Sequence, residues 1–278
     1  MDGARPGLTK VGDFATRGHG RFAPTGPDCF TGTHYSVETA MKLVRPALAS
    51  LLLSALLAAC ASAPEAVPVL PSIPGQVSHA AWEQDMQAFA AQDATSPPPK
   101  GALLFIGSSS IRLWDTLASD FPGTSVINRG FGGSEIRDST WYAGRIVVPY
   151  APRQIVLYAG DNDLASGRSP VQVGDDFRAF VQRVRRDLPK VKIAYISNKP
   201  SPSRANLLDL QRQANALVKA DAARLEVEFI DVFTPMLDAQ GQPRGELFLQ
   251  DRLHMNAAGY EVWKQVIRPY LDAGKPSR

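Results

Sequence analysis

An aspartate and a histidine stand three residues apart in the segment 251–254, just before the last apolar segment of the chain. This spacing lets the Asp251 carboxylate reach Nδ1 of His254 and leaves Nε2 free as a base, which would supply two members of a serine-hydrolase triad. An aspartate and a histidine at this spacing, with no other evidence, more often form a salt bridge or a helix cap. The catalytic interpretation is favoured here because His254 is the only histidine that follows His79. His79 is expected at the surface, where an N-terminal tether meets the folded domain.

Three further segments could supply partners for this pair. Each follows an apolar run, and they are Gly107–Ser110, Arg129–Ser134 and Gly160–Asp163. A serine at a strand-to-helix turn lies near free backbone amides, which favour an anion or a developing oxyanion. Glycines let a ligand approach the backbone closely. Taken alone, each segment also fits an ordinary turn, loop or helix cap.

Five short apolar runs are predicted to be the strands that position these segments. They are Ala102–Ile106, Ser125–Asn128, Ile155–Ala159, Val191–Ser197 and Leu225–Asp231. The first and third are nearly continuous apolar runs, which predicts strands buried on both faces of a parallel sheet. The last alternates apolar residues with Glu226 and Glu228 and is therefore predicted to be an edge strand.

Helical patterns lie between and after these strands. Apolar residues recur at helical spacing in 173–188, 207–218 and 260–270. Residues 169–172 have the pattern of a helix start. Ser169 would be the N-cap, Pro170 fits the first turn, and the Gln172 side chain could bond back to the N-cap backbone. Because strands and helices alternate, we expect one open α/β domain with about five parallel strands. The segments that follow the strands would meet at the carboxyl edge of such a sheet, where ligands bind.

Taken in order, these segments resemble the four sequence blocks of the SGNH, or GDSL, hydrolases. The matching residues are Gly107-Ser108-Ser109, Gly133 in the run 128–133, Asn162 in Gly160–Asp163, and finally Asp251 and His254. The resemblance spans about residues 102–271. It implies a flavodoxin-like, three-layer α/β domain that hydrolyses carboxylic esters and needs no cofactor or metal.

The resemblance also implies a role for each matching residue. Ser109 would be the nucleophile, and Asp251 and His254 would complete the triad. The backbone amides of Ser109 and Gly133, with the side-chain amide of Asn162, would form the oxyanion hole.

One position departs from the family pattern, because Ser108 stands where the family has an aspartate before the nucleophile. The triad acid comes from the last block, so the chemistry is expected to be retained. The family's register, two residues after Gly107, identifies Ser109 among the neighbouring serines.

Two other enzyme classes fit less well. Ile111 occupies the second glycine position of the Gly-x-Ser-x-Gly elbow of α/β-hydrolases. Glu135 occupies the third glycine position of the dinucleotide motif, and no lysine follows these glycines as in a P-loop.

The segment 41–60 has the pattern of a secretory signal. Lys42 and Arg45 precede an uncharged apolar run, Ala47–Ala59. As a helix this run rises about 20 Å, less than the roughly 30 Å of a hydrocarbon core, so a transmembrane anchor is disfavoured. It ends in Leu57–Cys60, which resembles the lipobox of bacterial lipoproteins and implies lipidation of Cys60. A buried apolar helix that ends in a cysteine is the alternative.

These patterns divide the chain into four parts. Residues 1–40 show no apolar period and are expected to be a disordered or mis-annotated extension before a true start at Met41. Residues 41–59 are the predicted signal peptide, 60–79 a lipidated cysteine with a Pro- and Ala-rich tether, and 80–278 the hydrolase domain. An ordered arm packed on the domain is the alternative to the tether. The predicted location is the bacterial cell envelope, with a lipid anchor in a membrane.

Charge and composition exclude other classes. The chain has 30 basic and 27 acidic residues. Removal of the six basic and four acidic residues before Cys60 leaves 24 and 23, so no nucleic-acid partner is expected. The chain holds two cysteines and four histidines, and this scarcity argues against a zinc site of the Cys/His type.

The expected substrate is a small-molecule or glycan-linked ester. The chain has no obvious lid insertion, which favours short acyl groups such as acetyl on a bulky alcohol. Trp114, Trp141, Tyr142 and the segment Lys199–Arg204 could line the substrate pocket, or the aromatic residues could belong to the core and the proline-rich segment could be a stiff connection. A non-catalytic, ligand-binding lipoprotein that keeps the SGNH scaffold is the competing interpretation.

Overall fold

A computed structural model of the chain describes residues 77–271. The predictions for the N-terminal extension, the signal peptide, Cys60 and most of the tether fall outside these residues. No helix within 77–271 is both long enough and apolar enough to cross a membrane.

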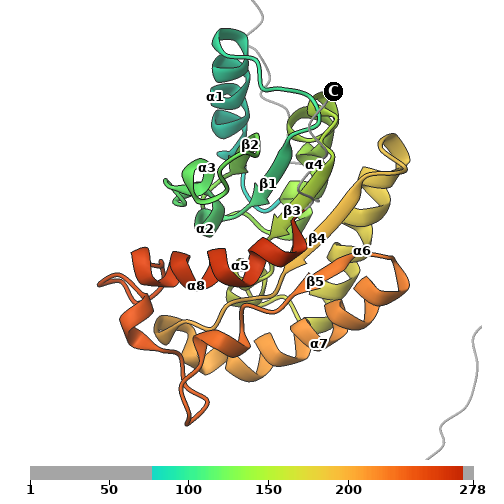
Figure 1. The fold of residues 1–278 in the computed structure, drawn as a ribbon. Coiled ribbons are helices and arrows are strands. Elements are labelled where there is room, and N and C mark those ends of the chain that lie inside the picture. Colours follow the sequence, from blue (N-terminus) through green and yellow to red (C-terminus); the bar gives the residue numbers. More distant parts are fainter. Residues whose placement is uncertain (1–76, 272–278) are drawn as a thin grey trace, which may run out of the picture. The chain divides into compact units, whose positions relative to one another are not determined.

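A five-stranded parallel sheet forms the centre of the described domain (Figure 1). Its strands are β1 (Leu103–Gly107), β2 (Val126–Gly130), β3 (Gln154–Tyr158), β4 (Lys192–Ile196) and β5 (Glu228–Ile230). They are ordered β2-β1-β3-β4-β5. This is the flavodoxin-like strand order, so the predicted fold class is confirmed.

All five predicted strands are present. Every residue of β1 and β3 is buried, as expected for strands with a neighbour on each side and helices over both faces. Strand β5 is an edge strand, as predicted, but it begins only at Glu228. Glu226 has a φ of 50°, and this left-handed conformation keeps the residues before Glu228 from extending the strand.

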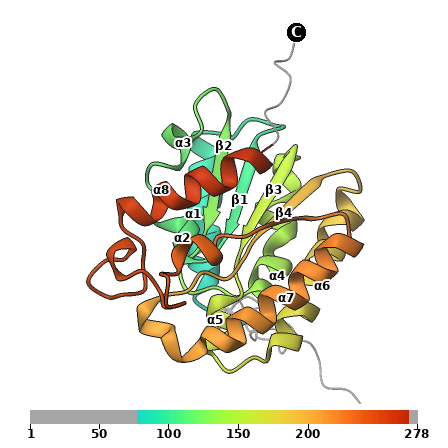
Figure 2. The same cartoon turned by 60° about the horizontal axis from the view of Figure 1, so that its bottom comes forward.

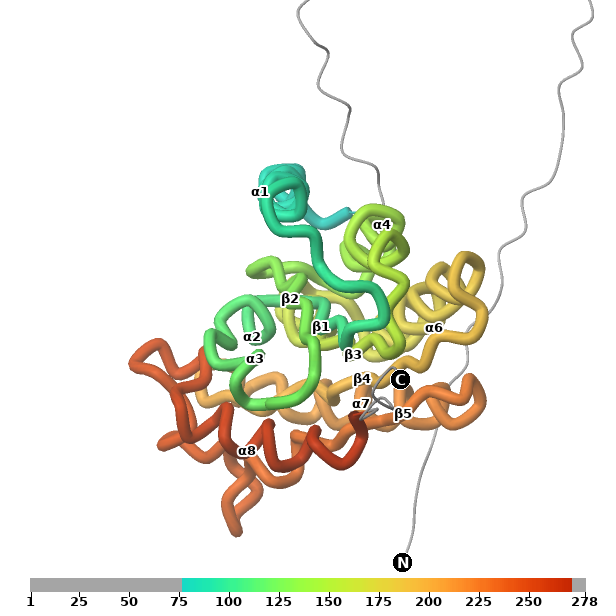
Figure 3. The backbone as a smooth tube through the Cα atoms, turned by 45° about the horizontal axis from the view of Figure 1, so that its top comes forward, coloured from blue at the N-terminus to red at the C-terminus, as the bar shows by residue number. Residues whose placement is uncertain are grey.

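Helices cover both faces of the sheet (Figures 2 and 3). Helices α1 (Trp82–Thr95), α4 (Ile136–Ile146), α6 (Pro170–Asp187) and α7 (Leu208–Arg224) enclose one apolar core. Helices α2 (Ser109–Arg112), α3 (Leu117–Asp120) and α8 (Ala257–Ile267) enclose the other. The short helix α5 (Asp161–Ala165) follows β3. Consecutive residues of β1, such as Leu104 and Phe105, point into different cores because side chains alternate along a strand.

The predicted start of α6 is confirmed, because the Ser169 hydroxyl and the Gln172 side chain form a capping box around Pro170. Helix α1 is not among the helices predicted from the sequence. Trp82 and Met86 stand four residues apart and Phe89 follows three later, so a helical apolar spacing was available to predict it.

Residues 77 and 78, the first that the structure describes, pack on the domain. Val77 is buried, and the backbone N–H and hydroxyl of Ser78 each donate a 2.6 Å hydrogen bond to the buried carboxylate of Asp138 in α4. Trp82 Nε1 in turn donates to the Ser78 hydroxyl at 3.0 Å. His79 is exposed, as expected from the sequence.

Candidate active site

The turn from β1 into α2 carries Ser109 as the first helical residue. Gly107, which ends β1, has a φ of 136°, and a Cβ atom there would lie 1.8 Å from the Tyr158 carbonyl oxygen. Only glycine therefore lets β1 turn this closely beside β3. Ser108 and Ser110 are each 3% exposed, whereas Ser109 is half-buried. Of these three serines, Ser109 is the accessible one.

The connection between β5 and α8 carries Asp251 and His254. One carboxylate oxygen of Asp251 accepts 2.9 Å hydrogen bonds from the backbone N–H groups of Leu253 and His254. The other oxygen lies 2.6 Å from Nδ1 of His254. The Leu253 amide, the His254 ring and the His254 amide lower the pKa of Asp251 to about 2, so this carboxylate is ionised at neutral pH.

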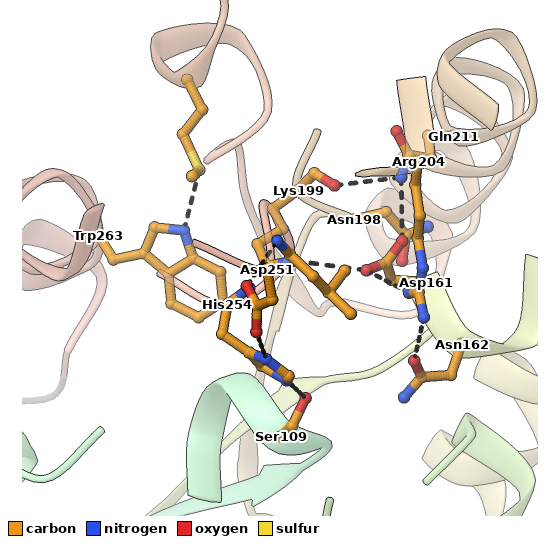
Figure 4. A network of polar contacts seen from close by, with 12 residues as sticks. Ser109, Asp161, Asn162, Asn198, Lys199, Arg204, Gln211, Asp251, His254 and Trp263 are labelled. Atoms are coloured by element: carbon orange, nitrogen blue, oxygen red, sulfur yellow. Dashed lines mark hydrogen bonds and ion pairs between the residues drawn. The ribbon is translucent and has the colours of Figure 1, made fainter. Parts of the chain in front are cut away.

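The remaining ring nitrogen of His254, Nε2, lies 3.1 Å from the Oγ atom of Ser109 (Figure 4). Asp251, His254 and Ser109 thus form one continuous chain of hydrogen bonds. With Nδ1 donating to Asp251, Nε2 carries the lone pair that can accept the serine proton, which is the arrangement of a catalytic triad. The three triad residues predicted from the sequence are brought together. The His254 side chain is 25% exposed, so the site is open to solvent.

The three predicted oxyanion-hole residues follow three adjacent strands. Gly107 at the end of β1 is in register with Gly130 of β2 and Tyr158 of β3, so these strands end at one level. Ser109, Gly133 and Asn162 follow them at the carboxyl edge of the sheet.

The loop that contains Gly133 and the side chain of Asn162 are in contact. Nδ2 of Asn162 donates a 3.0 Å hydrogen bond to the carbonyl oxygen of Ser134. Gly133 has a φ of 92°, and a Cβ atom there would lie 3.2 Å from the Trp82 ring. Within residues 77–271, neither the Ser109 amide nor the Gly133 amide donates to a backbone carbonyl. Both amides are therefore free to donate to a ligand.

The other residues considered from the sequence occupy different environments. Trp114 and Tyr142 are buried in the two cores, so for them the core interpretation is correct. Trp141 is 44% exposed, on α4. Lys199, which follows β4, is almost completely buried beside Asp161.

A cavity of about 480 Å³ lies between the end of α2 and the start of α8 and was not predicted from the sequence. It is lined by residues after α2 and around the start of α8: Leu113, Asp115, Thr116, Asp120, Leu249, Met255, Asn256, Ala257, Tyr260 and Glu261. The Leu113 N–H bonds to the Ser109 carbonyl oxygen, and Met255 follows His254 in the chain. The cavity therefore takes lining residues from the segments that carry Ser109 and His254, although none of the triad residues lines it.

No three His, Cys, Asp or Glu side chains in the described part of the chain are grouped so that they could hold a metal ion.

Comparison with protein-family models matches residues 106–262 to the GDSL-like lipase/acylhydrolase family. The chain belongs to this family. The matched segment begins before Ser109 and extends beyond His254, so it includes every residue of the candidate site. The predicted SGNH/GDSL resemblance is confirmed, and the chain is a carboxylic ester hydrolase by class. A comparison with curated protein sequences finds no match.

Solved structures with the same fold include three from bacteria. A protein from Streptococcus pneumonia, provisionally named a platelet activating factor, is 23% identical, with a TM-score of 0.62 over 68% of this chain and 92% of that one. A GDSL-like lipase from Bacteroides thetaiotaomicron is 19% identical, with a TM-score of 0.58 over 66% of this chain and 96% of that one. A mutant of Axe2, an acetyl-xylooligosaccharide esterase from Geobacillus Stearmophilus, is 17% identical, with a TM-score of 0.53 over 65% of this chain and 99% of that one.

Proposed function

We propose that this GDSL-family chain hydrolyses short-chain carboxylic esters, acetyl esters above all, through an acyl-enzyme on Ser109. The observation that carries the proposal is the unbroken contact from Asp251 through His254 to Ser109 Oγ. Nucleophilic serine hydrolysis requires this contact, because the hydroxyl attacks only when a base accepts its proton.

In the proposed first half-reaction, Nε2 of His254 takes the proton of Ser109 as Oγ attacks the ester carbonyl. Asp251 holds the ring orientation and stabilises its positive charge. Collapse of the tetrahedral intermediate breaks the bond to the alcohol, which leaves with the proton returned by His254. Water then attacks the acyl-serine with His254 as base, and the carboxylic acid and free Ser109 are released.

Negative charge develops on the carbonyl oxygen during both attacks. The amides of Ser109 and Gly133 and the Nδ2 group of Asn162 are proposed to meet this charge. Fixed donors of this type lower the barrier because they are already oriented when the charge appears.

The preference for short acyl groups is supported by the openness of the site. His254 is partly exposed, and we propose that the cavity formed next to its segment takes one substituent of the ester. Its lining includes Leu249 and Met255 as well as Asp115 and Glu261, so apolar surface alternates with carboxylates. Polar groups in a pocket fix the orientation of a ligand, and the carboxylates here would accept hydrogen bonds from a hydroxylated alcohol such as a glycan. Axe2 shows that this fold can serve acetylated sugars.

Hydrolysis of p-nitrophenyl acetate by the wild type and by Ser109→Ala tests the proposal. We expect steady turnover by the wild type and none above background by the variant. A panel of p-nitrophenyl esters of increasing acyl length should give a kcat/KM that falls beyond butyrate. Equal release by both proteins would contradict the assignment of Ser109 and favour the non-catalytic, ligand-binding interpretation.

We further propose that Cys60 is lipidated and anchors the enzyme in the bacterial envelope. The support is the lipobox-like run Leu57–Cys60 with its basic and apolar flanks. Cys60→Ser should move the protein from the detergent phase to the aqueous phase of a Triton X-114 partition. Mass spectrometry of the native protein should find no peptide from before Met41, and such a peptide would contradict the proposed start.

A further inference from the structure

The guanidinium group of Arg204 joins a buried carboxylate to the side chain of Asn162 (Figure 4). Its Nη1 atom lies 2.6 Å from a carboxylate oxygen of Asp161, and its Nη2 atom donates a 2.9 Å hydrogen bond to Oδ1 of Asn162. The Arg204 side chain is 17% exposed, so solvent screens these contacts only partly.

The two ends of the Asn162 amide have opposite hydrogen-bonding chemistry. Arginine can only donate, so its contact requires the oxygen of the amide. The Ser134 carbonyl can only accept, so its 3.0 Å contact requires the nitrogen. These two contacts fix the amide in one of its two orientations. In Figure 4 the nitrogen lies on the side of Ser109 and the oxygen faces Arg204.

This orientation is the one that an oxyanion hole needs. The Nδ2 group carries two hydrogens, and Ser134 takes one of them. The other has no partner among residues 77–271 and is available to a developing oxyanion. A reversed amide would present Oδ1 instead, which would repel the negative charge.

The Arg204 side chain is itself held in place by a buried network. Asp161 is almost fully buried, and its second carboxylate oxygen accepts a 3.0 Å hydrogen bond from Gln211. Lys199 Nζ lies 3.5 Å from the same Asp161 oxygen that pairs with Arg204. Because Lys199 remains beside this carboxylate, removal of Arg204 does not leave Asp161 without a cation. The fold is therefore expected to tolerate a change at Arg204.

We propose that Arg204 is a positioning residue for ester hydrolysis, which holds the Asn162 amide with its N–H toward the reacting carbonyl and polarises that donor. This inference rests on the proposed function. The same segment also supports the opposite side of the site, since the Ser203 N–H donates a 3.0 Å hydrogen bond to the carbonyl oxygen of Arg252, inside the turn between Asp251 and His254.

Steady-state hydrolysis of p-nitrophenyl acetate by three single variants is the first test of the inference. Arg204→Gln should lower kcat about 10- to 100-fold and leave KM within about threefold. The Ser134 carbonyl still holds Nδ2, so the loss should be smaller than that of a missing donor. Arg204→Lys should be intermediate, because a single ammonium cannot make the forked contact. The control, Arg186→Gln, removes an exposed arginine that pairs with Asp187 at the end of α6 and should stay within about twofold.

The deciding measurement is Arg204→Gln in an Asn162→Ala background. If Arg204 acts through Asn162, the double variant should be no more than about twofold slower than Asn162→Ala alone. Losses that multiply would overturn the inference, as would a raised KM with unchanged kcat or a wild-type kcat in Arg204→Lys. An inactive wild type would overturn the proposed function and this inference together, whereas multiplying losses in an active enzyme would overturn only the inference.

Discussion

Nε2 of His254 lies 3.1 Å from Oγ of Ser109, although the two residues are 145 positions apart in the chain. Ser109 begins the helix after strand β1, and His254 stands in the turn before helix α8. The carboxylate of Asp251 fixes the ring from the other side at 2.6 Å. At this distance Nε2 of His254 is within hydrogen-bond reach of the Ser109 hydroxyl, as a general base must be.

Ser109 should be the only serine of its segment that reacts with a fluorophosphonate. Ser108 and Ser110 are buried and make no contact with His254, so neither has a base to remove its proton. Peptide mass spectrometry of the labelled wild type should place the adduct on Ser109. Ser109→Ala should block labelling, whereas Ser108→Ala should retain it. An adduct on Ser108 or Ser110 would show that the assumed register of the nucleophile is wrong.

Asp251→Asn should reduce kcat about 10⁴-fold with little change in KM, the size of effect expected when a triad loses its carboxylate. An amide at this position can donate to Nδ1 and so favour the tautomer whose Nε2 carries the proton. The pKa of Asp251, lowered to about 2, means that the wild-type carboxylate stays ionised across the range of ordinary assays. Asp209→Asn, at an exposed ion pair on α7, is the matched control. A loss below tenfold would remove Asp251 from the triad.

Asn162→Ala should reduce kcat about 100- to 1,000-fold, because one oxyanion donor is lost. The KM for p-nitrophenyl acetate should change little, since the ground-state carbonyl carries less charge than the intermediate. Circular dichroism and the melting temperature should confirm that the variant is folded. A variant with wild-type kcat would exclude Asn162 from the oxyanion hole.

Asp163→Asn should stabilise the protein at high pH relative to the wild type. Burial, with a smaller contribution from the Glu135 carboxylate, raises the pKa of Asp163 to about 7. The hydrogen bond from the Ile136 N–H acts in the opposite direction and lowers the pKa. The folded protein therefore binds this proton more tightly than the unfolded chain, whose aspartate pKa is 3.8. The stabilising contribution is complete below pH 3.8 and is lost as the pH rises to about 7.

Urea unfolding of both proteins at several pH values measures this effect. The free energy of unfolding of Asp163→Asn minus that of the wild type should increase from about pH 4 to pH 8, by up to about 4 kcal/mol for a pKa shift of this size. The difference should level off above pH 8. A difference that does not vary with pH would show that Asp163 does not titrate as described.

Ser78→Ala should destabilise the domain by about 1–3 kcal/mol, because a buried carboxylate loses one of its donors. The Ser78 hydroxyl donates to Asp138 at 2.6 Å and also accepts from Trp82 Nε1. Urea unfolding at neutral pH measures the change. Ser119→Ala, which removes an exposed hydroxyl bonded to a backbone carbonyl, should change the stability by less than about 0.5 kcal/mol. Equal stability of Ser78→Ala and the wild type would show that this contact does not hold the N-terminal segment.

The sequence alone was sufficient to predict the parallel sheet, its edge strand β5 and the residues of the candidate triad. Alternating or continuous apolar runs report the burial of a strand directly, and short polar segments such as Asp251–His254 carry their chemistry within a few residues. The helix start at Ser169 could be predicted for the same reason, since its capping box involves neighbours in the chain.

Only the tertiary structure decided which distant side chains meet. The fork from Arg204 to Asp161 and Asn162 links residues about 40 positions apart, and no local pattern distinguishes Arg204 from a surface arginine. The burial of Lys199 was likewise hidden, because a lysine next to prolines is typical of an exposed loop. Local periodicity is set by the neighbours of a residue along the chain. The distance between two loops depends on how the whole sheet and its helices pack, and that packing determined the supports of the site.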